Sequence, residues 1–228
     1  FQNFKVNFDK VRYIPLLNYS DDLIHELDVN DENYSLFKEN KIIFVPTRHT
    51  EIKQLHILIN ALIEMIPSIE SNLIKKNIKF VFIKWGELYN VHSQMIESSS
   101  LKKYSFWIDL QTRSKLLTLI KSSYFIINEF TDPTKFPGFI GGITREALSI
   151  GKLVISHYSF EFDHLFHDSK PPLFDFENNS KSLKKVILDC INMTDKELMK
   201  KSLELNEWYN LEYNTKKLIQ QTIRLHYE

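Results

Sequence analysis

Five short apolar runs alternate along the chain with segments whose apolar residues recur at helical spacing. The runs are rich in β-branched and aromatic residues, which is typical of buried strands. Strands that are separated in sequence by helices pair in parallel, with the helices crossing over the faces of the sheet. The alternation therefore predicts an α/β fold with a doubly wound parallel sheet. The expected strands are 42–45, 78–83, 104–108, 123–127 and 152–156, and the expected helices are 52–66, 89–99, 113–122 and 143–150.

The two ends of the chain have a different character. Residues 18–40 are polar, acidic and turn-rich, and 168–179, with Pro171-Pro172 and Asn178-Asn179, is expected to be a loop. We divide the chain into a junction segment (1–40), an α/β domain (41–181) and C-terminal helices that pack on that domain (182–228). Minor elements are expected as a strand at 11–15, a helical turn at 23–27 and helices at 183–193, 196–209 and 213–227.

Composition excludes several functional classes. Lys and Arg together number 29, as do Asp and Glu, so the net charge is zero and duplex DNA or another nucleic acid is not an expected partner. No signal peptide is visible, and no apolar run approaches the roughly 18 residues needed to span a bilayer. The single Cys190 excludes an internal disulfide and is read as a small core residue. A reducing, cytoplasmic location is therefore expected.

Two basic residues, Arg48 and Lys53, follow the first strand of the alternation. They lie on the turn between that strand and the next helix, at the carboxyl edge of the sheet, where ligands of doubly wound folds bind. Cations beside the unpaired amides of a helix start are suited to a diphosphate. His49, next to Arg48, could also reach such a phosphate. By spacing alone, solvated surface charges are an equally good interpretation of Arg48 and Lys53.

Glycines mark two further points on the same edge. Gly86 ends the second strand, where it either lets a ligand approach the backbone or forms a tight turn with positive φ. Gly141-Gly142 opens the helix that carries Glu146, so backbone amides are available to an anion. Glu146 could accept hydrogen bonds from ribose hydroxyls. The alternative is an acid in the first turn that interacts only with the helix dipole. The fourth strand ends at Asn128, and a long loop that could close over a substrate follows it.

Taken in order, these motifs resemble the C-terminal, nucleotide-sugar-binding domain of GT-B glycosyltransferases, specifically the large retaining group often called family 4. The most specific match is 141–155, similar to the family's glutamate, alanine, glycine and apolar strand. Residues 46–53 look like its arginine and lysine turn, and 80–86 like its second strand and glycine. The resemblance covers about residues 11–225 and implies a Rossmann-like sheet with a helical tail.

What the resemblance implies is hexosyl transfer from a nucleotide diphosphate sugar with retention at the anomeric carbon, as in polysaccharide biosynthesis. Arg48 and Lys53 would be the catalytic pair that stabilises the departing diphosphate, and Glu146 would hold the ribose. No metal or other cofactor is required, since the two cations can replace it. The residues implied to contact the donor are Gly86, Glu129, Gly141, Gly142, Ile143 and Glu146.

The chain departs from the family at one position. The family usually carries a second glutamate eight positions before the one matched by Glu146, and this chain has Gly138 there. In the family that glutamate contacts the donor sugar. Glu129 or Asp132, on the same loop, could take over its role, and Asn128-Glu129-Phe130 looks like a variant found in some relatives.

A GT-B enzyme forms its active site between two Rossmann-like domains, and this chain has room for only one. The resemblance therefore implies that a glycan or lipid-linked acceptor is bound by an N-terminal domain or a partner chain. That half could also bring a peripheral membrane contact at the inner face of the membrane. The present chain alone should bind nucleotide but be catalytically incomplete.

Other interpretations stay open. A non-catalytic nucleotide-sugar-binding or regulatory subunit is favoured by Gly138, and a GT-B epimerase or phosphorylase would share the architecture. His157, His164 and His167 lie among acidic residues, which suggests a metal site, but their spacing matches no zinc motif. A polar segment after the last strand is the better interpretation.

Overall fold

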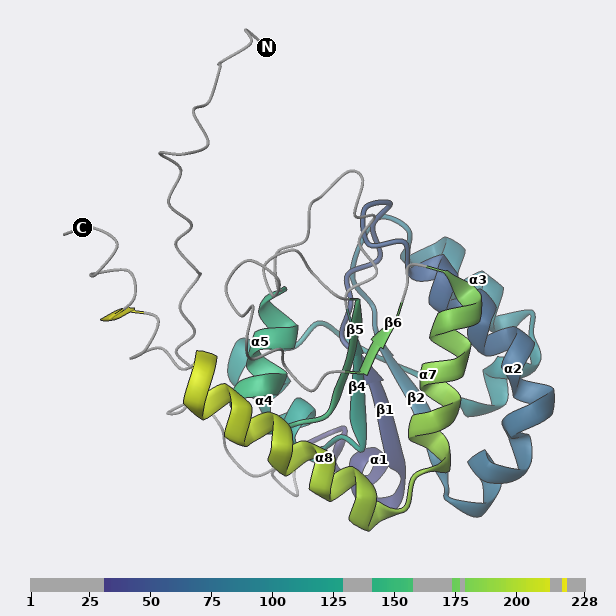
Figure 1. Cartoon of the computed structure of the whole chain (residues 1–228). Coiled ribbons are helices and arrows are strands. Elements are labelled where there is room, and N and C mark those ends of the chain that lie inside the picture. Colours follow the sequence, from purple (N-terminus) through teal and green to yellow (C-terminus); the bar gives the residue numbers. More distant parts are fainter. Residues whose placement is uncertain (1–30, 129–140, 158–173, 177–178, 214–218, 221–228) are drawn as a thin grey trace, which may run out of the picture.

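The structure is a computed structural model, and it describes residues 31–128, 141–157, 174–176, 179–213 and 219–220. Within these residues six strands form one fully parallel sheet with the order β3-β2-β1-β4-β5-β6 (Figure 1). This confirms the predicted doubly wound α/β fold. The strands are β1 (Lys41–Val45), β2 (Ile78–Ile83), β3 (Ser105–Ile108), β4 (Phe125–Asn128), β5 (Val154–His157) and β6 (Phe174–Phe176).

The strand order reverses between β1 and β4. From β1 the chain proceeds outward through β2 and β3, then returns to place β4 on the other side of β1 and continues through β5 to β6. The loops that follow β1 and β4 therefore leave the sheet in opposite directions. A crevice outside the carboxyl ends of the strands at such a switch point is where ligands bind in open α/β sheets.

Helices cover both faces of the sheet (Figure 1). On one face α2 packs against α3 and α7, and on the other α4 packs against α1 and α5, while α8 contacts α5. The helical elements are α1 (Tyr34–Glu39), α2 (Leu55–Lys75), α3 (Tyr89–Glu97), the 3₁₀-helix η3 (Ser100–Tyr104), α4 (Arg113–Ser122), α5 (Gly142–Ser149), α7 (Ser180–Asn192), α8 (Asp195–Trp208) and the π-helical turn η4 (Tyr209–Tyr213).

Helix α2 is longer than the sequence predicts. The expected helix ended at residue 66, just before Pro67, yet α2 continues through the proline to Lys75. Buried Ile69 and Leu73 extend its apolar face, and their packing offsets the hydrogen bond that the proline removes. In length and apolar composition α2 would also pass for a membrane span, contrary to the sequence expectation. Its apolar side chains instead form the core between the sheet and α7.

Other expectations were wrong in detail. The predicted loop 168–179 contains β6, whose Phe176 is buried, and the polar stretch 18–40 contains α1. Phe37 of α1 packs edge-to-face on Phe44 of β1, with ring centroids 5.8 Å apart. Residues 209–213 form a π-helical turn where the second tail helix was expected to end and the last to begin. The minor elements predicted at 11–15 and 23–27 lie outside the described residues, as does most of the helix predicted over 213–227.

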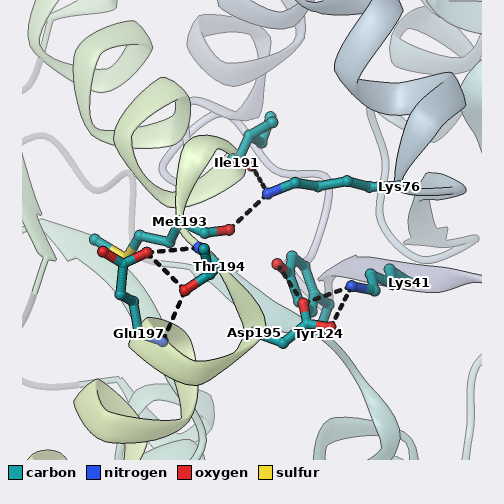
Figure 2. Close-up of polar contacts among 8 residues, drawn as sticks. All are labelled: Lys41, Lys76, Tyr124, Ile191, Met193, Thr194, Asp195 and Glu197. Carbon is teal, nitrogen blue, oxygen red and sulfur yellow. Dashed lines mark hydrogen bonds and ion pairs between the residues drawn. The ribbon is translucent and has the colours of Figure 1, made fainter.

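The turn between α7 and α8 is anchored at the amino edge of the sheet (Figure 2). Asp195, the first residue of α8, pairs with Lys41 of β1 at 2.7 Å and accepts a hydrogen bond from the Tyr124 hydroxyl at 3.2 Å. Lys76, which ends α2, donates to the carbonyl oxygens of Ile191 and Met193. These contacts hold the C-terminal helices at the edge opposite the switch-point crevice.

Candidate functional site

Arg48 and Lys53 lie on the β1–α2 loop, as predicted, and their surroundings differ. Arg48 is exposed, and its guanidinium lies over the ring of Trp85, 5.1 Å from the centroid, so the loops after β1 and β2 share it. Lys53 is half-buried on the turn before α2, where its backbone amide donates to the carbonyl oxygen of Thr50. α2 begins at Leu55 rather than at the predicted residue 52. Arg48 is therefore held against a neighbouring loop by its contact with Trp85.

Gly86 locks the loops after β1 and β2 together. Its φ is +120°, and a Cβ at this position would lie 2.3 Å from the carbonyl oxygen of His49. The backbone amide of His49 donates to the carbonyl of Trp85 at 2.8 Å, and the amide of Leu88 donates to that of His49 at 3.0 Å. The structure thus gives Gly86 a positive-φ turn, and the close approach it permits is to the backbone of His49.

His49 lies beneath the loop. Its ring is fully buried, with Nδ1 3.0 Å from Nδ1 of His92 and the ring of Trp107 5.6 Å away, centroid to centroid. Burial, reinforced by the nearby His92, lowers the pKa of His49 to about 4, so the ring is neutral near pH 7. A direct contact with a phosphate would require the ring to leave this position. The structure favours a supporting role for His49, and the sequence gave no sign of its partner His92.

Asn128 ends β4 and faces the interior. Its Oδ1 accepts a hydrogen bond from the hydroxyl of Thr47 at 2.9 Å, and its Nδ2 donates to the hydroxyl of Thr144 at 3.0 Å. Thr47 follows β1, and Thr144 is in the first turn of α5. Asn128 therefore connects the cation-bearing loop to the start of the glycine-led helix.

The start of α5 is open. Gly141 is the N-cap in extended conformation with no side-chain cap, so the first amides of the helix, beginning with Gly142 and Ile143, have no intrahelical acceptors. A Cβ on Gly142 would meet nothing within 4 Å. Unpaired amides at the positive end of a helix, with open space beside them, are suited to an anion.

Glu146 lies in the second turn of α5, which removes the alternative of a first-turn acid. Its side chain is nearly buried, and its Oε1 is 3.0 Å from Nε of Arg113. Burial raises the pKa of Glu146, and the guanidinium of Arg113 opposes that rise. Arg113, the first residue of α4 after β3, was missed by sequence reasoning, because only the folded sheet brings the two loops together.

No family model matches the sequence, and no curated protein does. Solved structures do match. A crystal structure of Anabaena HepE with UDP and glucose aligns with a TM-score of 0.64 and 16% identity, over 85% of this chain and 50% of that one. S. aureus TarM in complex with UDP and two sugar ligands aligns at 0.60 and 17%, over 82% and 35%.

The most complete overlap is with a single excised domain. The C-terminal domain of LpcC, a group 1 glycosyl transferase from Francisella tularensis, aligns with a TM-score of 0.61 and 13% identity, over 83% of this chain and 95% of that one. This chain has the fold of a GT-B C-terminal domain. At these identities the likeness shows the fold, and the chain spans about half the length of the HepE structure.

In this GT-B domain the described site residues gather at the carboxyl edge. Arg48 and Lys53 come from the loop after β1, Gly86 from the loop after β2, Asn128 from the end of β4, and Glu146 from α5. Predicted residues Glu129 and Asp132, like Gly138, His164 and His167, lie outside the described residues. Within the ranges that the structure describes, no three His, Cys, Asp or Glu residues are grouped to hold a metal ion.

Proposed function

We propose that this chain is the donor-binding domain of a retaining glycosyltransferase, which transfers a hexose from a nucleotide diphosphate sugar to a glycan or glycolipid acceptor. The observation that carries the proposal is the arrangement at the switch point. A loop with two cations, an open helix start and a nearly buried carboxylate all lie at the carboxyl edge, and Asn128 joins the loop to the helix. HepE and TarM, which share the fold, have been crystallised with UDP.

Each part has a proposed chemical task. Cleavage of the bond between the sugar and the phosphate leaves negative charge on the diphosphate, and fixed positive groups stabilise that charge as it develops. Arg48, Lys53 and the amides of Gly142 and Ile143 supply those groups. The carboxylate of Glu146 accepts hydrogen bonds from the ribose hydroxyls, for which it exchanges part of its contact with Arg113.

The acceptor side of the reaction belongs to the proposal as well. Because the chain spans about half of HepE, a second domain or a partner chain would supply the acceptor site and any peripheral membrane contact. A cytoplasmic location fits the zero net charge and single cysteine.

The test is a calorimetric titration of the chain with UDP, GDP, ADP and their sugar conjugates. We expect saturable binding of one nucleoside diphosphate. Lys53→Ala and Glu146→Ala should each weaken it about tenfold or more, because each removes a charged contact with the ligand. Lys75→Ala, at an exposed lysine near the opposite edge, is the control. The absence of binding by every nucleotide would overturn the proposal.

Gly138 favours a second candidate, a non-catalytic nucleotide-sugar-binding or regulatory subunit. The glutamate that would contact the donor sugar is missing, while the phosphate-site cations are present. Joining this chain to an N-terminal acceptor domain separates the two functions. Transfer by the joined protein supports the enzyme, and retained donor binding with no transfer supports the subunit.

A further inference from the structure

Four buried polar side chains connect the ends of the central strands with α5. Thr47 Oγ1 donates to Asn128 Oδ1 at 2.9 Å, Asn128 Nδ2 donates to Thr144 Oγ1 at 3.0 Å, and the hydroxyls of Thr144 and Ser156 are 3.4 Å apart. All four residues are at most 3% exposed. The residues follow β1, end β4, open α5 and lie in β5, so each comes from a different element.

Asn128 is at the centre of these contacts because its side chain has an acceptor and a donor on one rigid plane. The amide oxygen is used toward the β1 loop and the amide nitrogen toward α5. Buried polar groups are costly unless they are paired, and an apolar side chain would fill the same space at lower cost. A paired amide at this place therefore favours a defined spacing between the two elements over simple packing.

The two hydroxyl partners of Asn128 adjoin the two halves of the phosphate site. Thr47 immediately precedes Arg48 in the chain, and Thr144 follows Gly142 and Ile143 in the first turn of α5. A shift of either threonine moves the adjacent cation or the adjacent amides. Asn128 itself is buried, so it does not contact a ligand.

We propose that Asn128 is a positioning residue, which through Thr47 and Thr144 holds Arg48 and the start of α5 at the spacing that a bound diphosphate requires. The ligand in this inference rests on the proposed function. The relay of hydrogen bonds itself rests on the described contacts alone, so the two can be tested separately.

The first test measures affinity for the nucleoside diphosphate that binds best. Thr144→Val keeps the side-chain shape and removes the hydroxyl, and it should weaken binding about tenfold. Thr144→Ser keeps a hydroxyl and should recover most of the affinity. Thr118→Val is the matched control, since Thr118 is also a buried threonine, with its hydroxyl bonded to the carbonyl of Ser114 within α4.

A purely structural role predicts a different pattern. Thr144→Val and Thr118→Val would then lower the melting temperature by similar amounts and leave the affinity of the folded protein equal. That result would overturn the positioning role. If Thr144→Val does not fold, Thr47→Val removes the other hydrogen bond to Asn128 and gives the same comparison.

The second test needs no ligand. Amide hydrogen exchange is measured in the free chain. Thr47→Val should accelerate exchange in the first turn of α5, and Thr144→Val should accelerate it in 47–54, because each substitution breaks the relay at one end. Unchanged exchange at the far end, as in Thr118→Val, would overturn the relay. Transmitted loosening in a chain that binds no nucleotide would instead refute the proposed function and leave the relay in place.

Discussion

At the scale of single residues, the site depends on positions that tolerate one side chain. Gly86 combines φ of +120° with backbone contact to His49, and His49 combines full burial with a second histidine 3.0 Å away. Neither residue needs to touch a ligand to matter. Both determine where the loop that carries Arg48 lies.

Gly86→Ala is expected to destabilise the fold by at least about 2 kcal/mol, through strain at positive φ and overlap with the His49 carbonyl. Gly142→Ala is the control for stability, because its Cβ meets open space, and it should change the free energy of unfolding by less than about 1 kcal/mol. Urea unfolding measures both. Equal stability of the two variants would contradict the packing described for Gly86.

Stability should fall as the pH is lowered from about 6.5 toward 4. The folded pKa of His49 is about 4, below its usual 6.5, so the unfolded chain binds more protons in this window. His49 should therefore contribute on the order of 1 to 3 kcal/mol above pH 6.5, lost progressively toward pH 4. His49→Phe should flatten the profile from urea unfolding, whereas exposed His56→Gln should retain most of it. An unchanged slope in His49→Phe would count against this account.

At the scale of elements, the two edges of the sheet have separate tasks. The carboxyl edge holds the candidate site, while Lys41, Lys76, Tyr124 and Asp195 anchor the C-terminal helices at the amino edge (Figure 2). Changes at the amino edge should alter stability and leave ligand affinity intact.

Lys76→Gln tests this separation. It removes the ammonium that donates to the carbonyls of Ile191 and Met193 and should cost about 1 kcal/mol of stability. The neighbouring exposed Lys75→Gln should cost less. Nucleotide affinity, measured by calorimetry, should be unchanged in both. A weakened affinity in Lys76→Gln would show that the two edges are coupled.

The sequence predicted the elements whose pattern is local. Runs such as 78–83 are recognisable because their apolar side chains are buried on both faces, and β2 has those bounds. β6 is three residues long and follows a Pro-Pro pair, so its local signal was that of a loop, and only pairing with β5 makes it a strand. α2 passes Pro67 because tertiary packing continues beyond it.

The site was predictable to the same extent. Strand-to-helix turns place Arg48, Lys53 and Glu146 at the carboxyl edge, and that follows from the order of elements. The contacts of Glu146 with Arg113, of His49 with His92, and of Asn128 with Thr47 and Thr144 join residues 16 to 81 positions apart. No sequence period encodes them, because they depend on strand order and register.

At the scale of the whole molecule, a GT-B C-terminal domain offers one side of a donor site. The chain spans half of HepE, and we propose that the acceptor is bound elsewhere. The isolated chain should then bind donor nucleotide while transferring sugar poorly or not at all. A radiolabelled donor assay with a lipid-linked or glycan acceptor measures this, and efficient transfer by the chain alone would contradict it.

We also propose that donor binding needs no metal, since Arg48 and Lys53 supply the positive charge. Nucleotide affinity should then stay within about twofold when EDTA replaces magnesium, a change of less than about 0.5 kcal/mol. Calorimetry in the two buffers measures this. A loss of binding in EDTA that magnesium restores would show that a cation is part of the site.

The most direct test of the central claim, a nucleoside diphosphate site at the β1–β4 switch point, is amide hydrogen exchange with and without the tightest-binding nucleotide. We predict slower exchange in 47–54 and in the first turn of α5, with no change in 191–197 at the amino edge. Protection confined to the amino edge, or none at saturating nucleotide, would contradict the account.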